Sequence, residues 1–527
     1  MTTRTVTAQE LRRRWRNREE VALLDVREEG PYAESHPLFA LTVPVSEIQI
    51  KLPSLVPRLS APIVVYDDGE GYVARAVACI QSLGYADVSI LEGGLSSYAR
   101  VGEVYRDVNV PSKAFGELVE AIQHTPSLPA PQVEQVLKDE DVVVLDVRRY
   151  EEYNTMSIPR GRSCPGGELL HRVYEAAPSP DTTIVVHCAG RTRGLIGTQT
   201  LLNAGIPNKV FALRNGTIGW TLEGLSLENR KMERVPQPST EASAKSRMAA
   251  QAWAEHVGIV VINDDQLEKL AAEQDRTLHL LDVRDPEEYA LGHLPGFASA
   301  PGGQLVQATD EWVGVRGARL VLNDDDGVRA RITATWLHQL GWEVYVLEHD
   351  ARNGGGVNIA SRIPQWTASE TGAITVSDLT QLKEEPTIID LARSPKYRKG
   401  HIPGAWHASG PELARDVQQV GGNGPIVLTS PDGHVAAINA EYARHGTSRQ
   451  VYYLLGGTEA WVSAGRPLQT DIAKWLSEPI DIYDRPYEGT SSTREAMEGY
   501  IEWEHQLVAQ LANDGVSCFH VVRRPSS

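Results

Sequence analysis

The stretch of sequence that decides the fold is Ile184-Val185-Val186-His187-Cys188-Ala189-Gly190-Arg191-Thr192-Arg193-Gly194. It begins with an apolar, β-branched run, which predicts a buried parallel strand. The residues that follow, Leu195 to Leu202, are typical of a helix. A strand, a short loop and a helix in this order direct backbone N–H groups and the positive end of a helix dipole toward the loop. We therefore expect an anion site on this loop, with the Cys188 thiol shifted toward the thiolate.

Length and composition set the class of protein. The 527 residues predict three to four domains, and 41% hydrophobic with 23% charged residues is ordinary for a soluble globular chain. No apolar run approaches the roughly 18 residues of a membrane helix. The net charge of −18 argues against a general nucleic-acid or anionic-membrane surface. Four cysteines are too few for a disulfide framework and fit a reducing compartment, so we predict a cytoplasmic protein.

One structural unit occurs four times in the chain. An apolar run that ends in aspartate stands at Leu23–Asp25, Leu145–Asp146, Leu280–Asp282 and Ile388–Asp390. A second apolar run follows each of them. The residue after that second run lies 42 residues beyond the aspartate in the first three units, at Asp67, Cys188 and Asp324, and 40 residues beyond it in the fourth, at Ser430. This alternation of strands and helices predicts parallel α/β units of roughly 100 residues.

The repeats set the expected domain boundaries. We expect four α/β domains, each a parallel sheet flanked by helices, and a helical C-terminal extension, over residues 1–106, 127–230, 257–352, 372–468 and 469–527. The segment Lys231 to His256 is rich in Ser, Ala and Pro and is predicted to be a flexible joint. A further linker is expected from Asn353 to Thr371. Thr493 to Leu511 has apolar residues at helical spacing and is predicted to pack on a domain.

The repeated motifs resemble those of a known family. The pattern strand-Asp-Val-Arg, then Glu-Tyr, then His-Ile-Pro-Gly, followed by a strand that ends in Cys with a six-residue loop, resembles the rhodanese (sulfurtransferase) family. Up to about Pro467 the chain is similar to a tandem four-repeat rhodanese protein. The resemblance implies that Cys188 is the nucleophile. The loop departs from the family's Cys-x-x-Gly-x-Arg pattern because Gly190 stands one position early.

The other three repeats lack the nucleophile. Their equivalent positions hold Asp67, Asp324 and Ser430, none of which can carry a persulfide. We therefore predict that repeats one, three and four are catalytically silent. Residues 1 to about 230 are expected to form one compact half, and the third and fourth repeats the other half, because two-repeat members of the family commonly place the active repeat second.

The resemblance implies sulfur transfer from an anionic donor such as thiosulfate to cyanide or a thiol, through a persulfide on Cys188. Loop amides would stabilise the terminal sulfur, and guanidinium groups suit the sulfonate-like oxygens of the donor. The substrate-binding residues are predicted to be Ala189, Gly190, Arg191, Thr192, Arg193 and Gly194. Arg193 is expected to matter more than Arg191, because it matches the family's final loop arginine. The alternative is that one arginine pairs with an acidic residue of its own repeat and only braces the loop.

Neighbouring residues receive supporting roles. Asp146 and Arg148 are predicted to support the loop, and His187 to point to the opposite face of the strand. Cys164 is either a resolving thiol or, the interpretation we favour, a buried spectator, and Cys79 is expected in a helix core. No residue pair has metal-ligand spacing and no dinucleotide or Walker pattern occurs, so neither a metal nor a cofactor is expected.

Two other functions remain open. A rhodanese-fold scaffold or sulfur-sensing binding protein would explain three silent repeats. A cysteine-dependent phosphatase or arsenate reductase uses a related loop, but Arg193 follows Cys188 after only four residues, and the smaller loop suits sulfur better than phosphate. The expected partners are a small-molecule sulfur donor and a thiol or cyanide acceptor, with no nucleic acid and no membrane, and a homodimer is left open.

Overall fold

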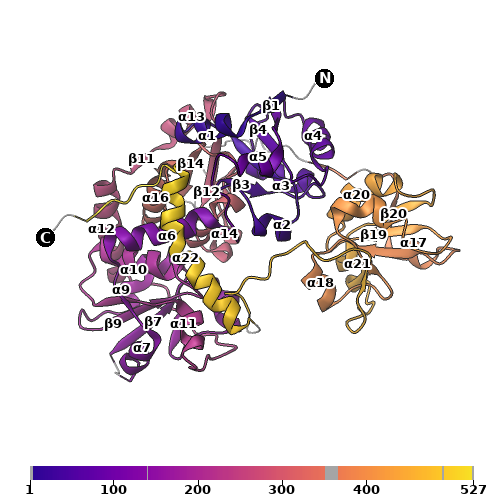
Figure 1. Cartoon of the computed structure of the whole chain (residues 1–527). Helices are drawn as coiled ribbons and strands as arrows, with labels where there is room; N and C mark the ends of the chain where they lie inside the picture. Colours follow the sequence, from indigo (N-terminus) through magenta and orange to yellow (C-terminus); the bar gives the residue numbers. More distant parts are fainter. Residues whose placement is uncertain (1–3, 139–140, 350–365, 369, 490–491, 525–527) are drawn as a thin grey trace. The chain divides into compact units, whose positions relative to one another are not determined.

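The computed structural model describes residues 4–138, 141–349, 366–368, 370–489 and 492–524 (Figure 1). Each of the four repeats forms one parallel sheet, which confirms the predicted fold class. Hydrogen bonds order the strands of the first sheet as β1 (Arg4–Val6), β5 (Val88–Leu91), β4 (Ile63–Tyr66), β2 (Ala22–Asp25) and β3 (Ala40–Thr42), and those of the second as β6 (Ser127–Leu128), β10 (Val210–Leu213), β9 (Thr183–His187), β7 (Val142–Asp146) and β8 (Gly161–Ser163). The order in the third sheet is β11 (Val260–Ile262), β15 (Glu343–Leu347), β14 (Arg319–Asn323), β12 (Leu278–Asp282) and β13 (Ala298–Ser299). The fourth sheet has six strands, in the order β16 (Ala373–Ile374), β20 (Val451–Leu454), β19 (Ile426–Thr429), β17 (Thr387–Asp390), β18 (Trp406–His407) and β21 (Lys474–Trp475).

Helices connect the strands, as parallel pairing requires. The first repeat contains α1 (Ala8–Arg16), α2 (Glu29–Glu34), α3 (Ile48–Leu55), α4 (Val73–Ser82) and α5 (Gly94–Tyr98), and α6 (Val110–Gln123) leads to the second, with α7 (Ala130–Val136), α8 (Tyr150–Thr155), α9 (Leu169–Ala176), α10 (Thr192–Ala204) and α11 (Gly216–Leu222). After α12 (Thr240–Val257) come α13 (Asp264–Ala272), α14 (Pro286–Leu291), α15 (Gly302–Gln307) and α16 (Arg329–Gln339) of the third repeat, then α17 (Val376–Thr380), α18 (Ser394–Lys399), α19 (Leu413–Asp416), α20 (His434–Arg444) and α21 (Gly457–Ser463) of the fourth, and finally α22 (Arg494–Asp514).

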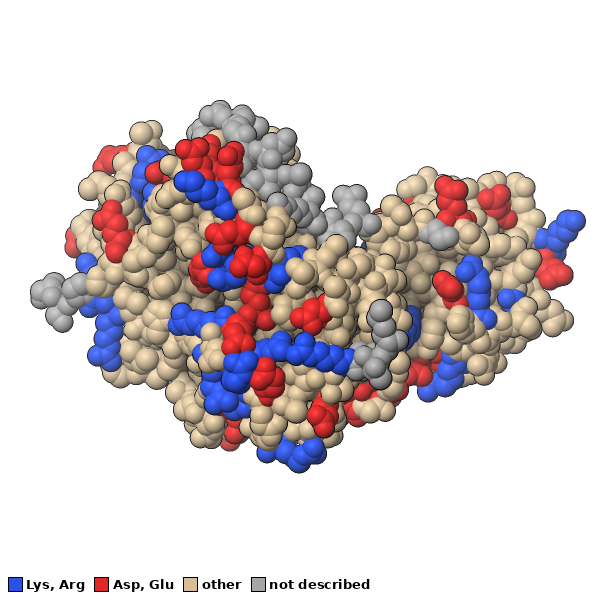
Figure 2. Space-filling view, turned by 90° about the horizontal axis from the view of Figure 1, so that it is seen from above, with Lys and Arg blue, Asp and Glu red and all other residues tan. Residues whose placement is uncertain are grey.

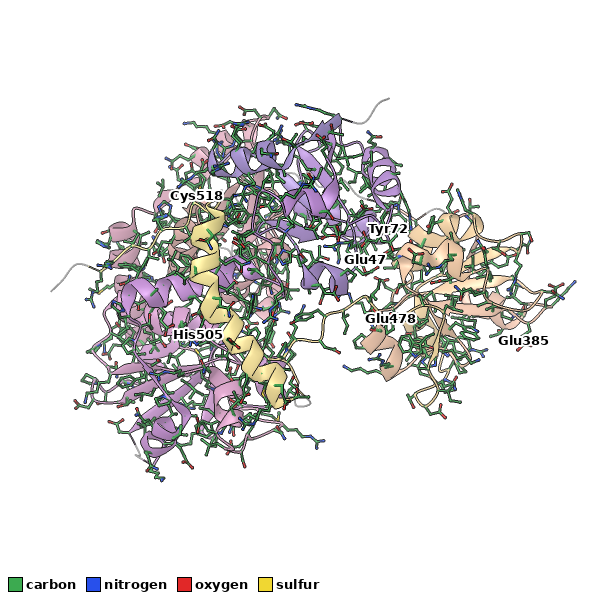
Figure 3. The ribbon with its side chains drawn as sticks, in the orientation of Figure 1. Glu47, Tyr72, Glu385, Glu478, His505 and Cys518 are labelled. Carbon is green, nitrogen blue, oxygen red and sulfur yellow. The ribbon has the colours of Figure 1, made fainter. Side chains whose placement is uncertain are left out.

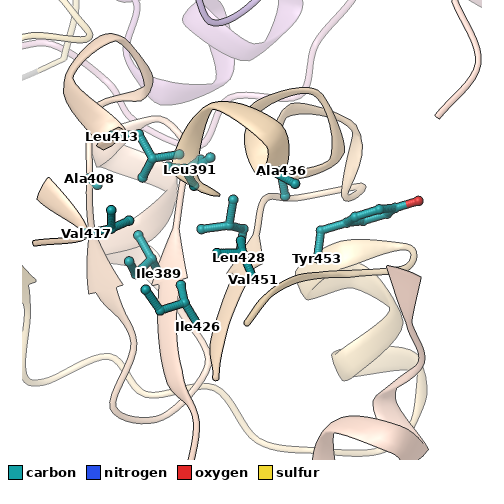
Figure 4. Packing of buried hydrophobic residues seen from close by; sticks show 12 residues of the cluster. Ile389, Leu391, Ala408, Leu413, Val417, Ile426, Leu428, Ala436, Val451 and Tyr453 are labelled. Carbon is teal, nitrogen blue, oxygen red and sulfur yellow. The ribbon is translucent and has the colours of Figure 1, made fainter. Parts of the chain in front are cut away.

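The central strands are apolar on both faces because helices cover both. In the fourth repeat, Ile389, Ile426 and Leu428 are fully buried between the sheet and its helices (Figure 4). Burial of such side chains contributes about 1.5–3 kcal/mol each to folding. The pairing of β7 with β9 sets Asp146 opposite His187, so the carboxyl ends of both strands meet at one edge of the second sheet. Cys188 follows directly at this edge.

The repeats associate in pairs that differ from the prediction. One compact unit contains the segment Ala22–Asp107 of the first repeat together with the fourth repeat, and the other contains the second and third repeats together with α6, α12 and α22. The prediction that residues 1 to about 230 form one half is therefore wrong. The prediction relied on the arrangement in family members with two repeats, whereas in this chain the third repeat packs on the second.

Two connecting segments test the interpretation of the linkers. The expected flexible joint Lys231 to His256 is instead largely the helix α12, which Ser239 caps by accepting the backbone N–H of Ala242 and which packs against α9 and α16. Its small and polar residues form an amphipathic helix rather than a coil. The linker predicted from Asn353 to Thr371 falls mostly outside the described residues. The predicted C-terminal helix is confirmed as α22, which packs against α6.

The described surface is mixed in charge. On the face shown in Figure 2, Lys and Arg side chains alternate with Asp and Glu side chains among the coloured residues. None of the helices in the described part of the chain combines the length and apolar character that a membrane crossing requires.

Candidate functional site

Cys188 lies between β9 and α10, at the position predicted from the sequence. Its side chain is buried, and its Sγ accepts the backbone N–H of Gly194 at 3.3 Å. Gly194 is in the first turn of α10, where N–H groups have no carbonyl partner within the helix. The helix N-terminus is therefore directed at the sulfur, and its dipole favours negative charge there.

The first residues of α11 fix the backbone of the loop. The N–H of Thr217 donates to the carbonyl of Cys188 at 3.0 Å, and the N–H of Ile218 donates to that of Ala189 at 2.9 Å. Gly216 has a φ of 55°, and a Cβ at this position would lie 2.3 Å from the Cys188 oxygen. Only glycine fits such an approach, so the start of α11 holds the loop in one conformation.

Arg193 is held by a carboxylate of its own repeat. Its guanidinium donates to the Glu152 carboxylate with two parallel bonds, of 2.7 and 2.8 Å. Glu152 belongs to α8, which follows the strand that ends in Asp146. A bidentate pair of this kind fixes the plane of the guanidinium. Arg193 also lowers the pKa of Cys188, so it lies close enough to stabilise an anionic sulfur.

Arg191 contacts carboxylates from a different segment. Its Nε and Nη2 donate to Glu117 at 2.7 and 2.9 Å, Nη2 also contacts Glu120, and Nη1 donates to Asn215 at 3.0 Å. Both glutamates lie on α6, between the first and second repeats. The pairing that the bracing alternative described, with a carboxylate of the same repeat, is made by Arg193 with Glu152, whereas the carboxylates bound to Arg191 lie outside the repeat. Donor binding by either arginine stays a prediction.

Asp146, Arg148 and His187 form a buried group beneath the loop. Arg148 donates to both Asp146 oxygens, at 2.9 and 2.7 Å, and Ser157 donates to one of them at 2.9 Å. Burial works to raise the pKa of Asp146, but His187 and Arg148 outweigh it and hold this pKa well below its usual range. The His187 ring lies 3.5 Å from Asp146; burial lowers the pKa of His187, and the charge of Asp146 opposes this shift. Its ring is directed toward Asp146 and Ser157.

The ionisation of Cys188 differs from the expectation. Burial raises the pKa of the thiol, and the charge of Glu504 adds to this, while Arg193, the Gly194 N–H and Arg148 lower it. The predicted shift toward the thiolate is therefore wrong for the resting thiol. The sequence shows the positive groups of the loop, but not how completely the site is removed from water.

The equivalent loops of the first and third repeats reveal what the loop backbone binds. Asp67 accepts N–H groups from Gly69, Tyr72 and Val73, at 3.1, 2.7 and 3.3 Å. Asp324 accepts those of Gly327 and Ala330, at 3.0 and 2.8 Å. We call these converging loop N–H groups the cradle. In the first and third repeats, a carboxyl group of the repeat itself occupies it.

The same bond recurs in every loop. The N–H six residues after Asp67, Asp324, Ser430 and Cys188 donates to that side chain, at 3.3, 2.8, 3.3 and 3.3 Å. In all four repeats the loop therefore directs this N–H at the side chain that follows the strand, which is a carboxyl group in the first and third repeats and a hydroxyl group in the fourth. Only the second repeat places a sulfur there.

A cavity of about 430 Å³ adjoins the loop at Arg193. Its lining includes Glu152, Arg149, Glu311 and Arg485. Charged groups of both signs therefore surround a space large enough for a small donor or acceptor.

The remaining cysteines lie elsewhere. Cys164 is fully buried, and burial raises its pKa to about 12, which fits the spectator interpretation. Cys79 is on α4 and half-buried, and Cys518 follows α22; all four cysteines are free thiols. The described residues contain no group of three or more His, Cys, Asp or Glu side chains that could hold a metal ion.

Several residues at the site were missed by the sequence analysis. Glu117, Glu120, Asn215, Tyr500 and Glu504 all lie against the Cys188 loop or its arginines. Most of them stand outside the repeated motifs, on α6 and α22. A signal exists for Glu504, because it interrupts the apolar stripe of Tyr500, Leu507 and Leu511 at helical spacing.

Comparison with known proteins decides the family. The model of the rhodanese-like domain matches residues 7–100, 129–223, 264–352 and 375–464. The chain belongs to the rhodanese family. A crystal structure of thiosulfate sulfurtransferase from Pseudomonas aeruginosa is 46% identical, with a TM-score of 0.95 over 99% of this chain and all of that one. An HTH-type transcriptional regulator of Mycobacterium tuberculosis is 28% identical over 200 residues, 37% of this rhodanese chain and 84% of the regulator.

Proposed function

We propose that this protein is a thiosulfate sulfurtransferase that uses Cys188. The Cys188 thiolate attacks the outer sulfur of thiosulfate, the S–S bond of the donor breaks, and sulfite leaves with the bonding pair. Cys188 then carries a persulfide anion. Cyanide attacks the terminal sulfur, takes it as thiocyanate and restores the thiolate; a thiolate acceptor would instead leave as a persulfide.

The observation that carries the proposal is the cradle shared by the four loops. Where the first and third repeats place a carboxylate against the loop N–H groups, the second places a sulfur with the Gly194 N–H directed at it. A persulfide adds one anionic atom at this point. Preorganised N–H donors in a buried site stabilise such a charge more than water-exposed donors do.

The charged surroundings support the same substrates. Arg193 is held by Glu152, lowers the pKa of Cys188 and lines the adjoining cavity, and its guanidinium suits the oxygens of a dianionic donor. The fold and the 46% identical thiosulfate sulfurtransferase support the activity in general. The donor, the acceptor and the persulfide on Cys188 are the proposal.

The test is thiocyanate formation from thiosulfate and cyanide by the wild type, Cys188→Ser and Cys164→Ser. We expect Cys188→Ser to lose turnover completely and Cys164→Ser, in which the altered thiol is a buried spectator, to keep it. Turnover in Cys188→Ser would contradict the proposal. An inactive wild type would favour the scaffold interpretation, and hydrolysis of an aryl phosphate that depends on Cys188 would favour a phosphatase.

A further inference from the structure

The C-terminal helix α22 covers the active loop at Gly190. A methyl group built on Gly190 would lie 3.1 Å from Cε1 of Tyr500 and 3.4 Å from Oε2 of Glu504. The Glu504 side chain is fully buried. A segment outside all four repeats therefore places a carboxyl group against the loop that carries Cys188 (α22 is the yellow helix with His505 labelled in Figure 3).

This carboxyl group is only half satisfied. The Tyr500 hydroxyl donates to Oε1 at 2.7 Å, whereas Oε2 has no hydrogen-bond partner among the described residues. An ionised carboxylate removed from water needs partners for both oxygens. The geometry favours the protonated, uncharged acid over the carboxylate.

The charged groups around Glu504 do not compensate a negative charge. On α6, Glu117 adds a second carboxylate, and Arg191 of the loop is already paired with Glu117 and Glu120. Lys113 of α6 donates to the Tyr487 hydroxyl at 3.1 Å and lies over the rings of Tyr487, Tyr500 and Trp503. His505, the next residue on α22, is half exposed.

These surroundings set the ionisation of both groups. Burial and Glu117 raise the pKa of Glu504 to about 8, although Lys113, the Tyr500 hydroxyl and Arg191 oppose the shift. The charge of Glu504 in turn raises the pKa of Cys188. The two groups therefore interact, and one negative charge disfavours the other.

We propose that Glu504 is a positioning residue that controls the charge of the active loop: it keeps its proton while the sulfur on Cys188 is an anion, and its ionisation suppresses sulfur loading. The inference rests on the proposed function. When Cys188 takes the outer sulfur of thiosulfate and sulfite leaves, Glu504 neither gains nor loses a proton, so of these two groups only the sulfur is negatively charged. With Glu504 ionised, two negative charges, on Cys188 and on Glu504, would face a dianionic donor.

The experiment compares the wild type with Glu504→Gln between pH 6 and pH 10. Glutamine keeps the shape of the protonated acid and cannot ionise. Glu502→Gln, on the exposed face of the same helix, is the matched control. Two rates are measured: single-turnover sulfur loading from thiosulfate, and alkylation of Cys188 by iodoacetamide, which requires no sulfurtransferase activity.

We expect the wild type and Glu504→Gln to react alike near pH 6.5, where Glu504 is protonated in the wild type. Above pH 8 the wild type should fall behind, by about three- to tenfold in both rates near pH 9.5, because like charges disfavour each other's ionised forms. Glu502→Gln should follow the wild type. Tyr500→Phe removes the hydrogen bond that lowers the pKa of Glu504, so it should move this divergence to higher pH.

Other outcomes overturn the inference. Rate profiles of the wild type and Glu504→Gln that coincide at every pH would overturn it. A decrease of both rates in Glu504→Gln by the same factor at every pH would also overturn it, because such a decrease indicates a structural role alone. If Glu504→Gln does not fold, the pH profiles of the wild type and Tyr500→Phe are compared, and profiles that coincide at every pH overturn the inference. If the wild type takes no sulfur, the proposed function fails, while the alkylation profile still decides the role of Glu504.

Discussion

At the scale of single residues, Arg191 and Arg193 stand two apart but face different partners. Arg193 is paired with Glu152 and lowers the pKa of Cys188, whereas Arg191 is bound by Glu117 and Glu120 on α6. We expect Arg193→Ala to lower kcat/KM for thiosulfate by roughly ten- to hundredfold, since a lost charge-assisted contact costs about 1.5–3 kcal/mol. Arg191→Ala should lose less. Steady-state kinetics measures both, and a larger loss for Arg191→Ala would contradict this ranking.

The aspartates that end β7 and β17, Asp146 and Asp390, allow a test by the pH dependence of stability. Asp146 has Arg148 as a partner, but the equivalent position to Arg148 in the fourth repeat is Ala392, and burial raises the pKa of Asp390 to about 7. A carboxyl group whose pKa is raised on folding stabilises fully below its unfolded pKa, and this contribution is lost as the pH rises through about 7.

We expect Asp390→Asn to remove this dependence. The free energy of unfolding of the variant should decline less between pH 5.5 and pH 8 than that of the wild type, by about 2 kcal/mol. Urea unfolding at the two pH values measures it. Asp146→Asn is the control of opposite sign: its carboxylate stabilises above its unfolded pKa, so the variant should be destabilised at pH 8. A steeper decline in Asp390→Asn than in the wild type would refute the argument.

At the scale of elements, local patterns predicted what depends on local sequence. The strand before Cys188, the loop and the helix α10 follow from the apolar run and the residues after it. The contacts of α6 and α22 with the loop could not be predicted, because they join residues about 70 to 300 positions apart that match none of the repeats. The charge of the loop was visible, but not the burial that raises the pKa of Cys188.

The helix α12 shows how composition can mislead. Its segment is rich in Ser and Ala, yet Ala250, Trp253 and Ala254 form a buried face. We expect Trp253→Ala to cost about 3–5 kcal/mol of unfolding free energy, the usual range for a large buried aromatic. Met248→Ala on the same helix, where the side chain is 74% exposed, should cost little. Urea unfolding checks both, and equal effects would indicate that α12 is a loose joint after all.

At the scale of the whole molecule, the repeat that carries Cys188 packs against segments that are distant in the sequence. The second and third repeats form one unit with α6, α12 and α22, and Arg329 of the third repeat pairs with Glu168 of the second. The third repeat thus supports the second without a nucleophile of its own. Repetition predicted the number and type of domains, but not which repeats associate, because that depends on surfaces rather than motifs.

The central claim is that one sulfur atom is carried by Cys188 alone, and intact mass measured after treatment with thiosulfate tests it most directly. The account predicts that the wild type gains the mass of one sulfur atom, that cyanide removes it, and that Cys188→Ser gains nothing. A stable gain of sulfur in Cys188→Ser, or a wild type that gains more than one cyanide-labile sulfur, would contradict the account.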